Sequence, residues 1–473
     1  MKILLVRPKT DFSDMILGIP IGLSLLAAAA RKEGHEVHIQ DLALETTPER
    51  ARKTLGALLA ERSFDLAGIT CMTVEYEGAR QSAGLIRQAQ PDCRIVLGGQ
   101  HPTIQTAKVL KDACADFLAV GEGEETFREL LSRLGNRQDT VAVPGLYSKN
   151  RGEWTGGSPR PLIQDLDQIP FPAYDMLSME RYFTMESARY TPKHPRAMQI
   201  FTSRGCPWQC IYCHSLFGKK FRARSAASVL AEMQLLHERY GVGEFMIEDD
   251  VFNLDLERAK EICDRIIQSG MKVYLQFGNG LRLERFDPEL AQKLAQAGTH
   301  HIAIGIESAS PRIQAMIRKN VRLDHARQVI GWLRRNRIRT LGFFMIGFPF
   351  ETGEEIRQTI QYAAESDLDE ALFSIVVPYP GTELHRMVTE AGLYDPEQVG
   401  AGGAGLARLR SEHWDFAALR RLQRRAYLTF FLRRARFLRV LPRLANPKLA
   451  RKYGKALLRN FFPFALRSSS RIN

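Results

Sequence analysis

Cysteine is scarce in this chain: its 473 residues contain seven, and three of the seven fall within eight consecutive positions. The other four are scattered, which argues against the disulfide framework of a small secreted protein. No run reaches the roughly 18 uncharged apolar residues of a membrane span, and the N-terminus lacks the pattern of a secretory signal peptide. We therefore expect a cytoplasmic protein of two or three domains.

Acidic residues are nearly absent from the C-terminal region. From Arg408 onward, 18 lysines and arginines stand against two acids, a net charge of +16, so the rest of the chain carries −3 of the total of +13. The body of the protein is close to neutral. Its overall basicity is therefore not a sign of nucleic-acid binding by the body.

The clustered thiols are Cys206, Cys210 and Cys213, and they follow an apolar run, 197–202, that reads as a buried strand. Thiolates this close together usually hold a soft metal or an iron–sulfur centre. A structural zinc site needs four ligands, and no further cysteine completes this one, while His214 directly follows the third thiol and is awkwardly placed. Three protein ligands on a four-iron cluster would leave one iron open to a small molecule. Zinc binding or unrelated thiols are the alternative.

The CxxxCxxC spacing, with Tyr212 before the third cysteine, resembles the radical S-adenosylmethionine (SAM) enzymes. In that family, the amino and carboxylate groups of SAM chelate the open iron of a [4Fe-4S] cluster. The reduced cluster then cleaves the sulfonium and yields a 5′-deoxyadenosyl radical. The resemblance thus implies two cofactors, a [4Fe-4S] cluster and SAM.

The first 147 residues alternate short apolar runs with segments of helical periodicity. The runs expected as strands are 3–6, 37–39, 66–70, 94–97 and 117–120. This alternation predicts an α/β fold with a doubly wound, parallel, Rossmann-like sheet, in which ligands bind beyond the carboxyl ends of the strands. The absence of GxGxxG after the first run disfavours a dinucleotide.

Because it directly precedes a radical SAM-like core, this region resembles a cobalamin-binding domain, and 17–23, 98–103 and 121–124 match the usual pattern. The resemblance implies cobalamin contacts by residues at the strand ends: Thr70, Met72, Thr73, Gly98, Gly99, His101, Gly121 and Glu122. The DxHxxG motif of cobalamin-dependent mutases is missing. We therefore expect cobalt without a protein histidine and a structural or corrin-lining role for His101. A degenerate domain that binds no cobalamin is the alternative.

The central part of the chain predicts a second α/β unit. Residues 148–161 are polar and glycine-bearing, which predicts a hairpin or loop, and the prolines of 165–174 favour an extended tether. Six apolar runs then alternate with helical segments: 198–202, 244–248, 272–277, 301–306, 341–346 and 372–377. Six such units predict a partial (β/α)6 TIM-type barrel with its chemistry at the carboxyl ends of the strands.

We expect four segments along the chain. They are a cobalamin-binding Rossmann-like domain at 1–147, a linker at 148–190, a radical SAM core barrel at 191–386 and a C-terminal helical basic region at 387–473.

Each expected barrel strand ends in a polar or glycine motif, and their order along the chain supports the resemblance more than any single motif does. The resemblance implies that SAM is held through its amino group by Asp249 and Asp250, through its carboxylate and ribose by Arg282, Asn279, Glu307 and Ser308, and near its adenine by Gly347 and Pro349. Taken singly, these residues also fit solvated turns, structural ion pairs or loop punctuation. Tyr379 is expected beside the substrate, with a packed tyrosine at the barrel mouth as the alternative.

The C-terminal region mixes arginines with Phe, Leu and Tyr at helical spacing over 416–439 and again over 449–464, after a glycine-rich stretch, 400–405, that we expect to be flexible. This suits an interfacial helix on anionic lipid, and a helical cap on the barrel with a solvated basic face is the alternative. No nucleic-acid module is recognisable. Cys263 reads as a core residue, and since no cysteine follows it, we expect no auxiliary cluster or methyl-carrying cysteine in the C-terminal region.

Together the resemblances imply a cobalamin-dependent radical SAM enzyme, related to the anaerobic magnesium-protoporphyrin ester cyclases. We expect it to methylate an unactivated carbon of a hydrophobic or membrane-associated small molecule, such as a lipid or tetrapyrrole. Oxidative cyclisation or rearrangement without methyl transfer is one alternative, and a non-catalytic cofactor-binding or sensory protein is another. The expected partner is an electron donor such as flavodoxin or ferredoxin, and the expected location is the cytoplasm, at the inner membrane face if the tail binds lipid.

Overall fold

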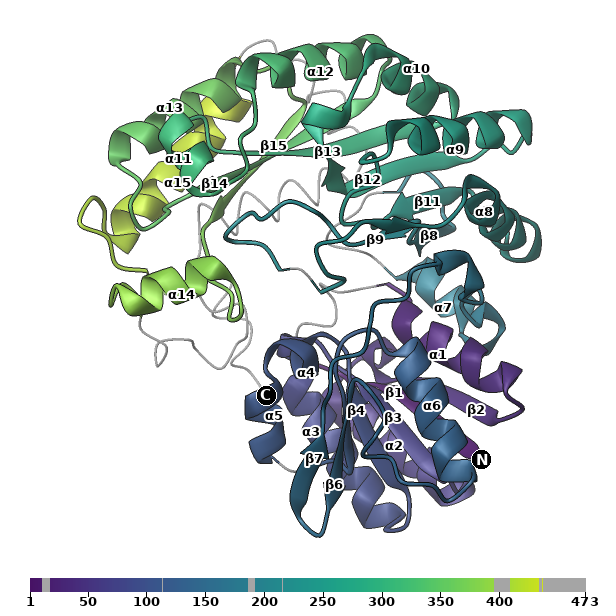
Figure 1. Ribbon diagram of the computed structural model, residues 1–473. Helices are drawn as coiled ribbons and strands as arrows, with labels where there is room; N and C mark the ends of the chain where they lie inside the picture. The colour runs from purple at the N-terminus through teal and green to yellow at the C-terminus, as the bar shows by residue number, and fades with distance from the viewer. Residues whose placement is uncertain are drawn as a thin grey trace.

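The computed structural model describes residues 1–10, 18–112, 114–185, 192–214, 216–394, 409–433 and 436. They form two α/β units, each built on its own sheet (Figure 1). The glycine-rich stretch 400–405, residue 17 of the expected cobalamin pattern, and the tail from residue 437 lie outside the described residues.

The N-terminal sheet has the strand order β2-β1-β3-β4-β5-β6-β7, and its first five strands are parallel. Its strands are β1 (Lys2–Arg7), β2 (Glu36–Asp41), β3 (Leu66–Thr70), β4 (Arg94–Gly98), β5 (Phe117–Ala119), β6 (Leu146–Asn150) and β7 (Glu153–Gly156). Its helices are α1 (Ile21–Lys32), α2 (Pro48–Glu61), α3 (Tyr76–Ala89), α4 (Gln100–Ile104), α5 (Thr106–Asp112) and α6 (Glu124–Gly135). The order of the parallel strands places the topological switch point between β1 and β3. The prediction of a doubly wound sheet is confirmed.

Strand β1 shows why these residues form a central strand. Leu4 and Val6 pack into one core, Ile3 and Leu5 into another on the opposite face of the sheet, and all four are fully buried. A parallel strand covered by helices on both faces needs such a continuous apolar run.

The hairpin expected within 148–161 is present as β6 and β7, and it joins the N-terminal sheet beside β5 in antiparallel pairing. The boundary expected at residue 147 therefore falls inside β6. The tether that follows is anchored on the barrel, because the buried Tyr174 hydroxyl donates to Glu232 Oε1 at 2.6 Å. A short helix, α7 (Met179–Thr184), completes the connection.

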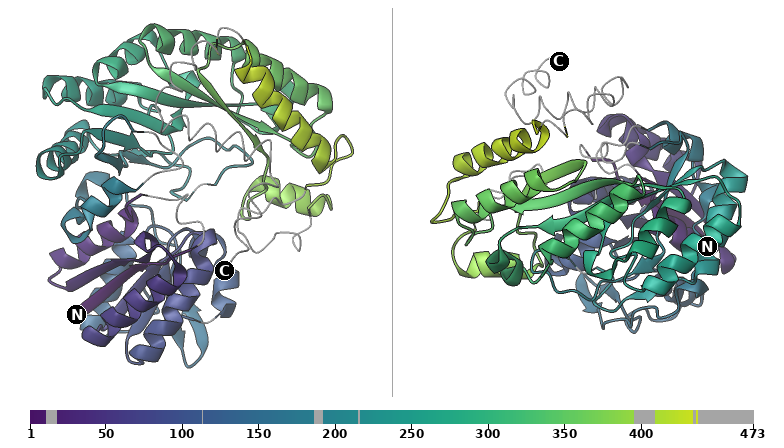
Figure 2. Two further views of the ribbon diagram at one scale, coloured as in Figure 1. Left: turned by 180° about the vertical axis from the view of Figure 1, so that it is seen from behind. Right: turned by 90° about the horizontal axis from the view of Figure 1, so that it is seen from above.

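The second sheet has six strands, all parallel and in the order β8-β11-β12-β13-β14-β15. They are β8 (Ala197–Ile200), β11 (Glu244–Ile247), β12 (Tyr274–Leu281), β13 (Thr299–Glu307), β14 (Arg339–Ile346) and β15 (Glu370–Ile375). The helices are α8 (Ala226–Tyr240), α9 (Leu256–Gln268), α10 (Pro288–Gln296), α11 (Pro311–Met316), α12 (Leu323–Arg335), α13 (Gly353–Glu365) and α14 (Glu383–Glu390). The strands curve beneath an outer layer of helices (Figures 1 and 2), so the expected partial barrel is confirmed.

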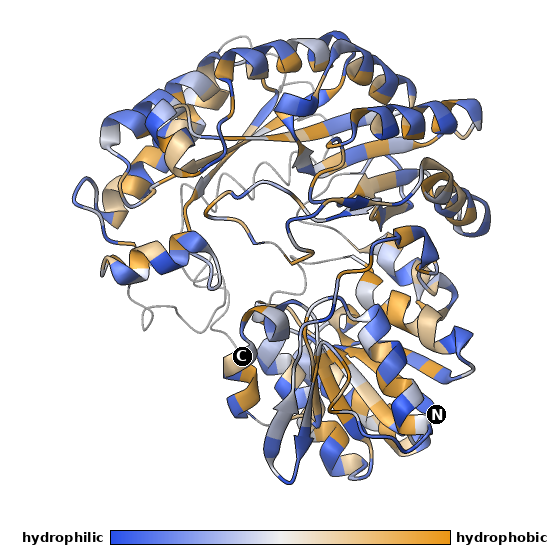
Figure 3. Cartoon of the chain, in the orientation of Figure 1, coloured by the Kyte–Doolittle hydropathy of each residue, from blue (hydrophilic) through white to orange (hydrophobic). Residues whose placement is uncertain are grey.

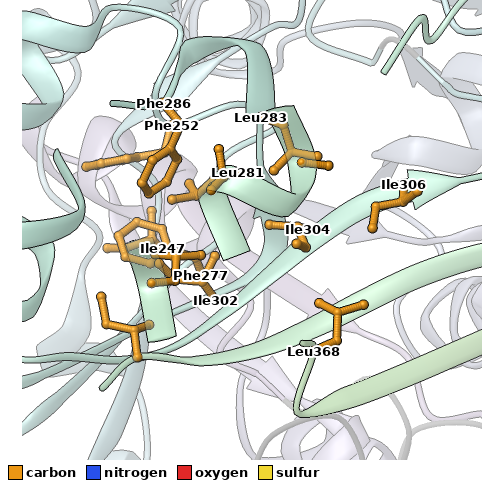
Figure 4. Packing of buried hydrophobic residues seen from close by; sticks show 14 of the residues in the cluster. Ile247, Phe252, Phe277, Leu281, Leu283, Phe286, Ile302, Ile304, Ile306 and Leu368 are labelled. Carbon is orange, nitrogen blue, oxygen red and sulfur yellow. The ribbon is translucent and has the colours of Figure 1, made fainter. Parts of the chain in front are cut away.

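The barrel core lies between the strands and the outer helices, with hydrophilic residues turned outward on those helices (Figure 3). Phe277, Ile302 and Ile304 from neighbouring strands pack together with Phe252 (Figure 4). Cys263, 1% exposed on α9, belongs to the same core, as expected.

The first part of the basic C-terminal region covers the barrel. Helix α15 (Phe416–Phe431) packs against α13 and the edge strand β15, and its Leu419, Ala426 and Phe430 are buried. On β15, the backbone N–H of Phe373 donates to the Tyr427 hydroxyl at 3.3 Å, and its C=O accepts from the Gln423 side chain at 2.7 Å. Beyond the helix, the buried Arg436 donates to the carbonyls of Leu368 and Ser366. No helix within the described residues is long and apolar enough to cross a membrane.

The same C-terminal segment braces a turn after β14. The would-be Cβ of Gly347, whose φ is +85°, meets Leu419 Cδ2 at 2.4 Å, so this position excludes a side chain. Pro349 C=O accepts from Ser411 Oγ at 2.8 Å. Glu351, fully buried, accepts the backbone N–H of Gly347 at 2.7 Å, and burial raises the pKa of its carboxyl to about 8.

This buried carboxyl predicts a pH-dependent stability. Between about 4.3, the ordinary pKa of glutamate, and the folded pKa of about 8, the folded protein holds a proton that the unfolded chain has released. The contribution of Glu351 to the free energy of unfolding is therefore fully present below that window and declines as the pH rises through it, by at most about 1.4 kcal/mol per pH unit.

Urea denaturation of wild type and Glu351→Gln at several pH values measures this effect. The difference in unfolding free energy between the two should shift in favour of the variant as the pH rises from 5 to 8. Glu354→Gln, which alters an exposed acid at the start of α13 that pairs with Arg357, should leave the slope unchanged. A slope identical in wild type and Glu351→Gln would contradict the account.

Candidate functional site

The three clustered thiols lie in a loop, 205–221, that begins and ends in a two-stranded antiparallel ribbon. Its strands are β9 (Ser203–Arg204) and β10 (Arg222–Ala223), and Arg222 pairs with Arg204 in register. We call residues 205–221 the cysteine loop. It lies at the carboxyl end of β8, between the two sheets (Figure 1). Gly205, with φ +83°, starts it, and a Cβ there would meet Lys220 O at 2.3 Å.

Two adjacent carboxylates at the end of β11 hold the start of this loop. Asp249, 2% exposed, accepts from Thr202 N at 2.6 Å, from Thr202 Oγ1 at 2.5 Å and from Ser203 Oγ at 2.6 Å. Asp250 Oδ2 accepts from Gly205 N at 3.1 Å, and its side chain is exposed. Both oxygens of Asp249 accept from protein donors, and its expected contact with a ligand amine stays a prediction. Its carboxylate supports the loop, and Asp250 is the acid that faces outward.

The three thiols influence one another. The protein surroundings raise the pKa of Cys213 to about 11, and after burial the largest causes are the negative charges of Cys210 and Cys206. Burial likewise raises the pKa of Cys206. Bound iron would favour the thiolate forms instead. Among the described residues, no three Cys, His, Asp or Glu side chains converge on one metal ion.

A turn after α11 forms another side of the site. Ile317 O accepts from Ile211 N at 3.2 Å, and Arg318 O accepts weakly from Cys210 Sγ at 3.8 Å. Arg282, at the end of β12, donates to Lys319 O at 2.7 Å and stacks on Trp208 at 4.3 Å from the ring centroid. The loop, the turn and the strand end therefore hold one another.

Lys319 extends from this turn to the end of β13. Its Nζ lies 2.7 Å from Glu307 Oε1, both side chains are about nine-tenths buried, and Glu307 adopts φ +66°. A Cβ at Gly305 would lie 2.5 Å from Lys319 Nζ, so glycine makes room for the pair. Sequence reasoning missed Lys319, because a single lysine in a short turn carries no pattern that marks its partner.

Other expected SAM contacts divide between the site and the core. Tyr212 is partly buried, and the charges of Glu307 and the thiols add to burial in raising its pKa. Asn279 Nδ2 donates to Glu248 O at 2.7 Å at the end of β11. Ser308, by contrast, is fully buried and hydrogen-bonds to Thr359 of α13 at 3.2 Å. The Ser308 side chain thus turns toward the outer helix, and its expected contact with a ligand stays a prediction.

Tyr379 lies on the loop after β15 and is 51% exposed. Its ring centroid is 6.0 Å from that of His214, the residue after the third thiol. In the same loop, a Cβ at Gly381 would lie 3.0 Å from Ile104 of α4. The loop thus lies between the cysteine loop and the N-terminal unit.

The strand ends of the N-terminal sheet carry the residues expected around cobalamin. Gly99 has φ +99°, and a Cβ there would lie 2.7 Å from Thr70 Oγ1, so the turns after β3 and β4 pack against each other. Gly121, with φ +87°, has open space where a Cβ would be. The turn after β3 also carries Met72, whose N–H donates to Glu75, and Gly98 ends β4.

Two residues of that set face inward. His101 is 2% exposed, its Nδ1 lies 3.2 Å from Thr73 Oγ1, and its ring packs on Tyr76 at 4.2 Å. Burial lowers its pKa to about 4, so the ring is neutral. The burial and packing of His101 favour the structural one of its two expected roles, which stays a prediction. Glu122 is also buried, and its carboxylate pairs with the two arginines of the cysteine-loop ribbon.

Comparison with known proteins agrees with this arrangement. The sequence profile of the Radical SAM superfamily matches residues 200–363, and that of the B12 binding domain matches residues 17–131. An uncharacterized methyltransferase of Pyrococcus horikoshii is 33% identical over 92% of this chain and 93% of its own. The cytidylyl-2-hydroxyethylphosphonate methyltransferase of Streptomyces wedmorensis is 28% identical over 84% and 83%. The hopanoid C-3 methylase of Methylococcus capsulatus is 26% identical over 81% and 72%.

Among solved structures, the cobalamin-dependent SAM radical enzyme OxsB with aqua-cobalamin and SAM bound shares the fold. Its TM-score is 0.76 at 15% identity, over 97% of this chain and 71% of that one. The family's cofactors are SAM, a [4Fe-4S] cluster and cobalamin, and the three thiols of the cysteine loop, with Cys213 influenced by the charges of the other two, fit the cluster. The chain therefore belongs to the cobalamin-dependent radical SAM methyltransferases.

Proposed function

We propose that this enzyme methylates an unactivated carbon of a small molecule. The observation that carries the proposal is the three-thiol loop at the carboxyl ends of the barrel strands, facing the strand ends of the N-terminal sheet. When bound, the cluster with SAM supplies a carbon-centred radical and cobalamin supplies the methyl group. The protein holds these groups in place and excludes water from the radical.

In this proposal, Cys206, Cys210 and Cys213 hold the cluster. Asp249 fixes the strand end before the loop through Thr202 and Ser203, and Asp250 fixes Gly205. The exposed face of Asp250, with the carbonyls at the end of β11, offers acceptors for the ammonium group of SAM.

The remaining SAM contacts come from the neighbouring strand ends. Arg282 and Lys319 bring positive charge for the carboxylate, and Glu307 and Asn279 bring acceptors and a donor for the ribose. Tyr212 and the braced turn with Gly347 and Pro349 lie on the adenine side. In the absence of a ligand, Lys319 pairs with Glu307. When SAM binds, Lys319 would donate to the SAM carboxylate and Glu307 would accept from the ribose, so their own ion pair would weaken.

Cobalamin is proposed on the strand ends of the N-terminal sheet, against the glycine turns at Gly98, Gly99 and Gly121 and beside Thr70, Met72 and Thr73. In this proposal none of these strand-end residues is a histidine ligand of the cobalt, because the His101 ring packs on Tyr76. Tyr379, half exposed between the units, is proposed beside the substrate.

The function is tested with SAM carrying a labelled methyl group, added to protein reconstituted anaerobically with iron, sulfide and hydroxocobalamin. Label in an organic product is the expected result. Deoxyadenosine with an unlabelled product would point to cyclisation or rearrangement, which the named methyltransferase relatives do not favour. Cys210→Ala should abolish SAM cleavage and lose the cluster's optical absorption, whereas Cys263→Ala, in the core, should retain both. Full activity in Cys210→Ala would overturn the proposal.

Lys319 yields a second test. Lys319→Met removes the buried ammonium and should weaken SAM binding to the reconstituted, unreduced protein by about tenfold or more, the loss of one charge-assisted hydrogen bond. Equilibrium dialysis with labelled SAM measures this. Lys220→Met, an exposed lysine of the cysteine loop that bonds Gln164, is the matched control. Equal affinity in Lys319→Met and wild type would remove Lys319 from the SAM site.

We also propose a hydrophobic or membrane-associated substrate, because the basic and apolar tail suits an anionic lipid surface and one relative is named a hopanoid methylase. The test can be made at a defined position, since residues 409–433 and Arg436 belong to the barrel's cover. Truncation after residue 436 should leave the fold intact and lower binding to phosphatidylglycerol vesicles several-fold relative to full-length protein. Unchanged vesicle binding would argue instead for a polar substrate, as the name of the phosphonate methyltransferase relative allows.

A further inference from the structure

Both ends of the cysteine loop carry a buried arginine. Arg204 lies in β9, two residues before the first thiol, and Arg222 lies opposite it in β10. Their side chains are 10% and 2% exposed. Within the loop, Arg222 donates to Phe217 O at 2.8 Å, and the Arg204 guanidinium lies 5.2 Å from the Phe217 ring centroid. The two guanidinium groups therefore fix the shape of the loop's base.

The partners of these arginines belong to the other sheet. Glu122, in the turn after β5, accepts from Arg204 Nη1 at 3.1 Å and from Arg222 Nη1 at 2.9 Å. Glu124, at the start of α6, accepts from Arg204 Nη2 at 2.5 Å. Glu122 also accepts the backbone N–H of Ile163, in the tether, at 2.9 Å. One carboxylate of the N-terminal unit thus binds both ends of the cysteine loop and the connecting chain.

The network is balanced in charge and shielded from water. Two cations face two anions, and the Glu122 and Glu124 side chains are 4% and 11% exposed. Removing one partner from such a group leaves a buried charge without compensation. The planar forks of the arginines also fix direction as well as distance. A flexible tether between the two units would provide neither.

We propose that Glu122, with Glu124, Arg204 and Arg222, is a clamp that sets the thiols in position relative to the strand ends of the N-terminal sheet. These four are positioning residues, since none of them contacts a thiol. On the N-terminal side, Glu122 directly follows Gly121, beside which there is open space. On the barrel side, Arg204 lies two residues before Cys206. Its consequence for catalysis, a fixed separation between cluster and cobalamin, depends on the proposed function, but the clamp itself does not.

Hydrogen exchange of the full-length protein tests the clamp without cofactors. Glu122→Gln keeps the side chain's size and removes its charge, and amides within 205–221 should exchange about tenfold or more faster than in wild type. Glu125→Gln is the matched control, because Glu125 lies three residues further on, in the first turn of α6, has a 43% exposed side chain and pairs with Arg128. Amides of β1 and β13 should be unchanged in both variants. If the amides of 205–221 exchanged at the wild-type rate in Glu122→Gln, the clamp would be refuted.

If Glu122→Gln loses protection across β1 and β13 as well, Arg222→Lys decides the question, because it keeps the charge and loses the two-pronged geometry. Faster exchange confined to 205–221 then supports the clamp, and wild-type exchange refutes it. A second readout uses protein loaded with iron, sulfide and hydroxocobalamin and then reduced. Electron paramagnetic resonance measures the magnetic coupling between cob(II)alamin and the reduced cluster. The distribution of coupling strengths should be broader in Glu122→Gln than in Glu125→Gln at equal cofactor content. Absence of cobalamin in wild type would defeat the proposed function but leave the exchange result standing.

Discussion

The hydrogen bonds of the Asp249 carboxylate are the interaction on which the site depends. The described residues of the cysteine loop form no helix or strand between β9 and β10, so hydrogen bonds from outside the loop must give them a shape. Asp249 accepts from the backbone N–H and hydroxyl of Thr202, directly before the ribbon, and from the hydroxyl of Ser203, its first residue. A buried carboxylate costs much less free energy when several donors satisfy it. The loop is thereby held to the end of β11 before any metal binds.

Much of the fold could be predicted from the sequence. All six barrel strands lie within a few residues of the expected runs, because strands buried between helices and a barrel interior need unbroken apolar stretches. The hairpin at β6 and β7 was expected from polar and glycine residues, but its attachment to the N-terminal sheet was not, since local composition does not specify which sheet a hairpin joins. The cysteines were identifiable because their spacing is itself the chemical signal.

The directions of the other site residues could not be predicted. Asp249 and Asp250 are adjacent and alike in type, yet one is buried under the loop and the other is exposed. The buried run 242–249 ends between them, and nothing in the sequence marks that point. Ser308 and His101 sit in the expected turns but face the core. Lys319 and Arg204 find partners 12 and 80 residues away. Such pairs depend on how elements pack, which a single sequence does not reveal.

The side chains of α15 that bind Phe373 have a consequence for solubility. Strand β15 is the last of its sheet, and a free strand edge is a template on which another chain can add itself and start aggregation. Gln423 and Tyr427 occupy the backbone N–H and C=O of Phe373, and the helix covers the surface beside them. The open barrel is thus protected by a helix where a closed eight-stranded barrel would use a further strand. Without α15, the catalytic unit would expose the edge of β15 to pairing with other chains.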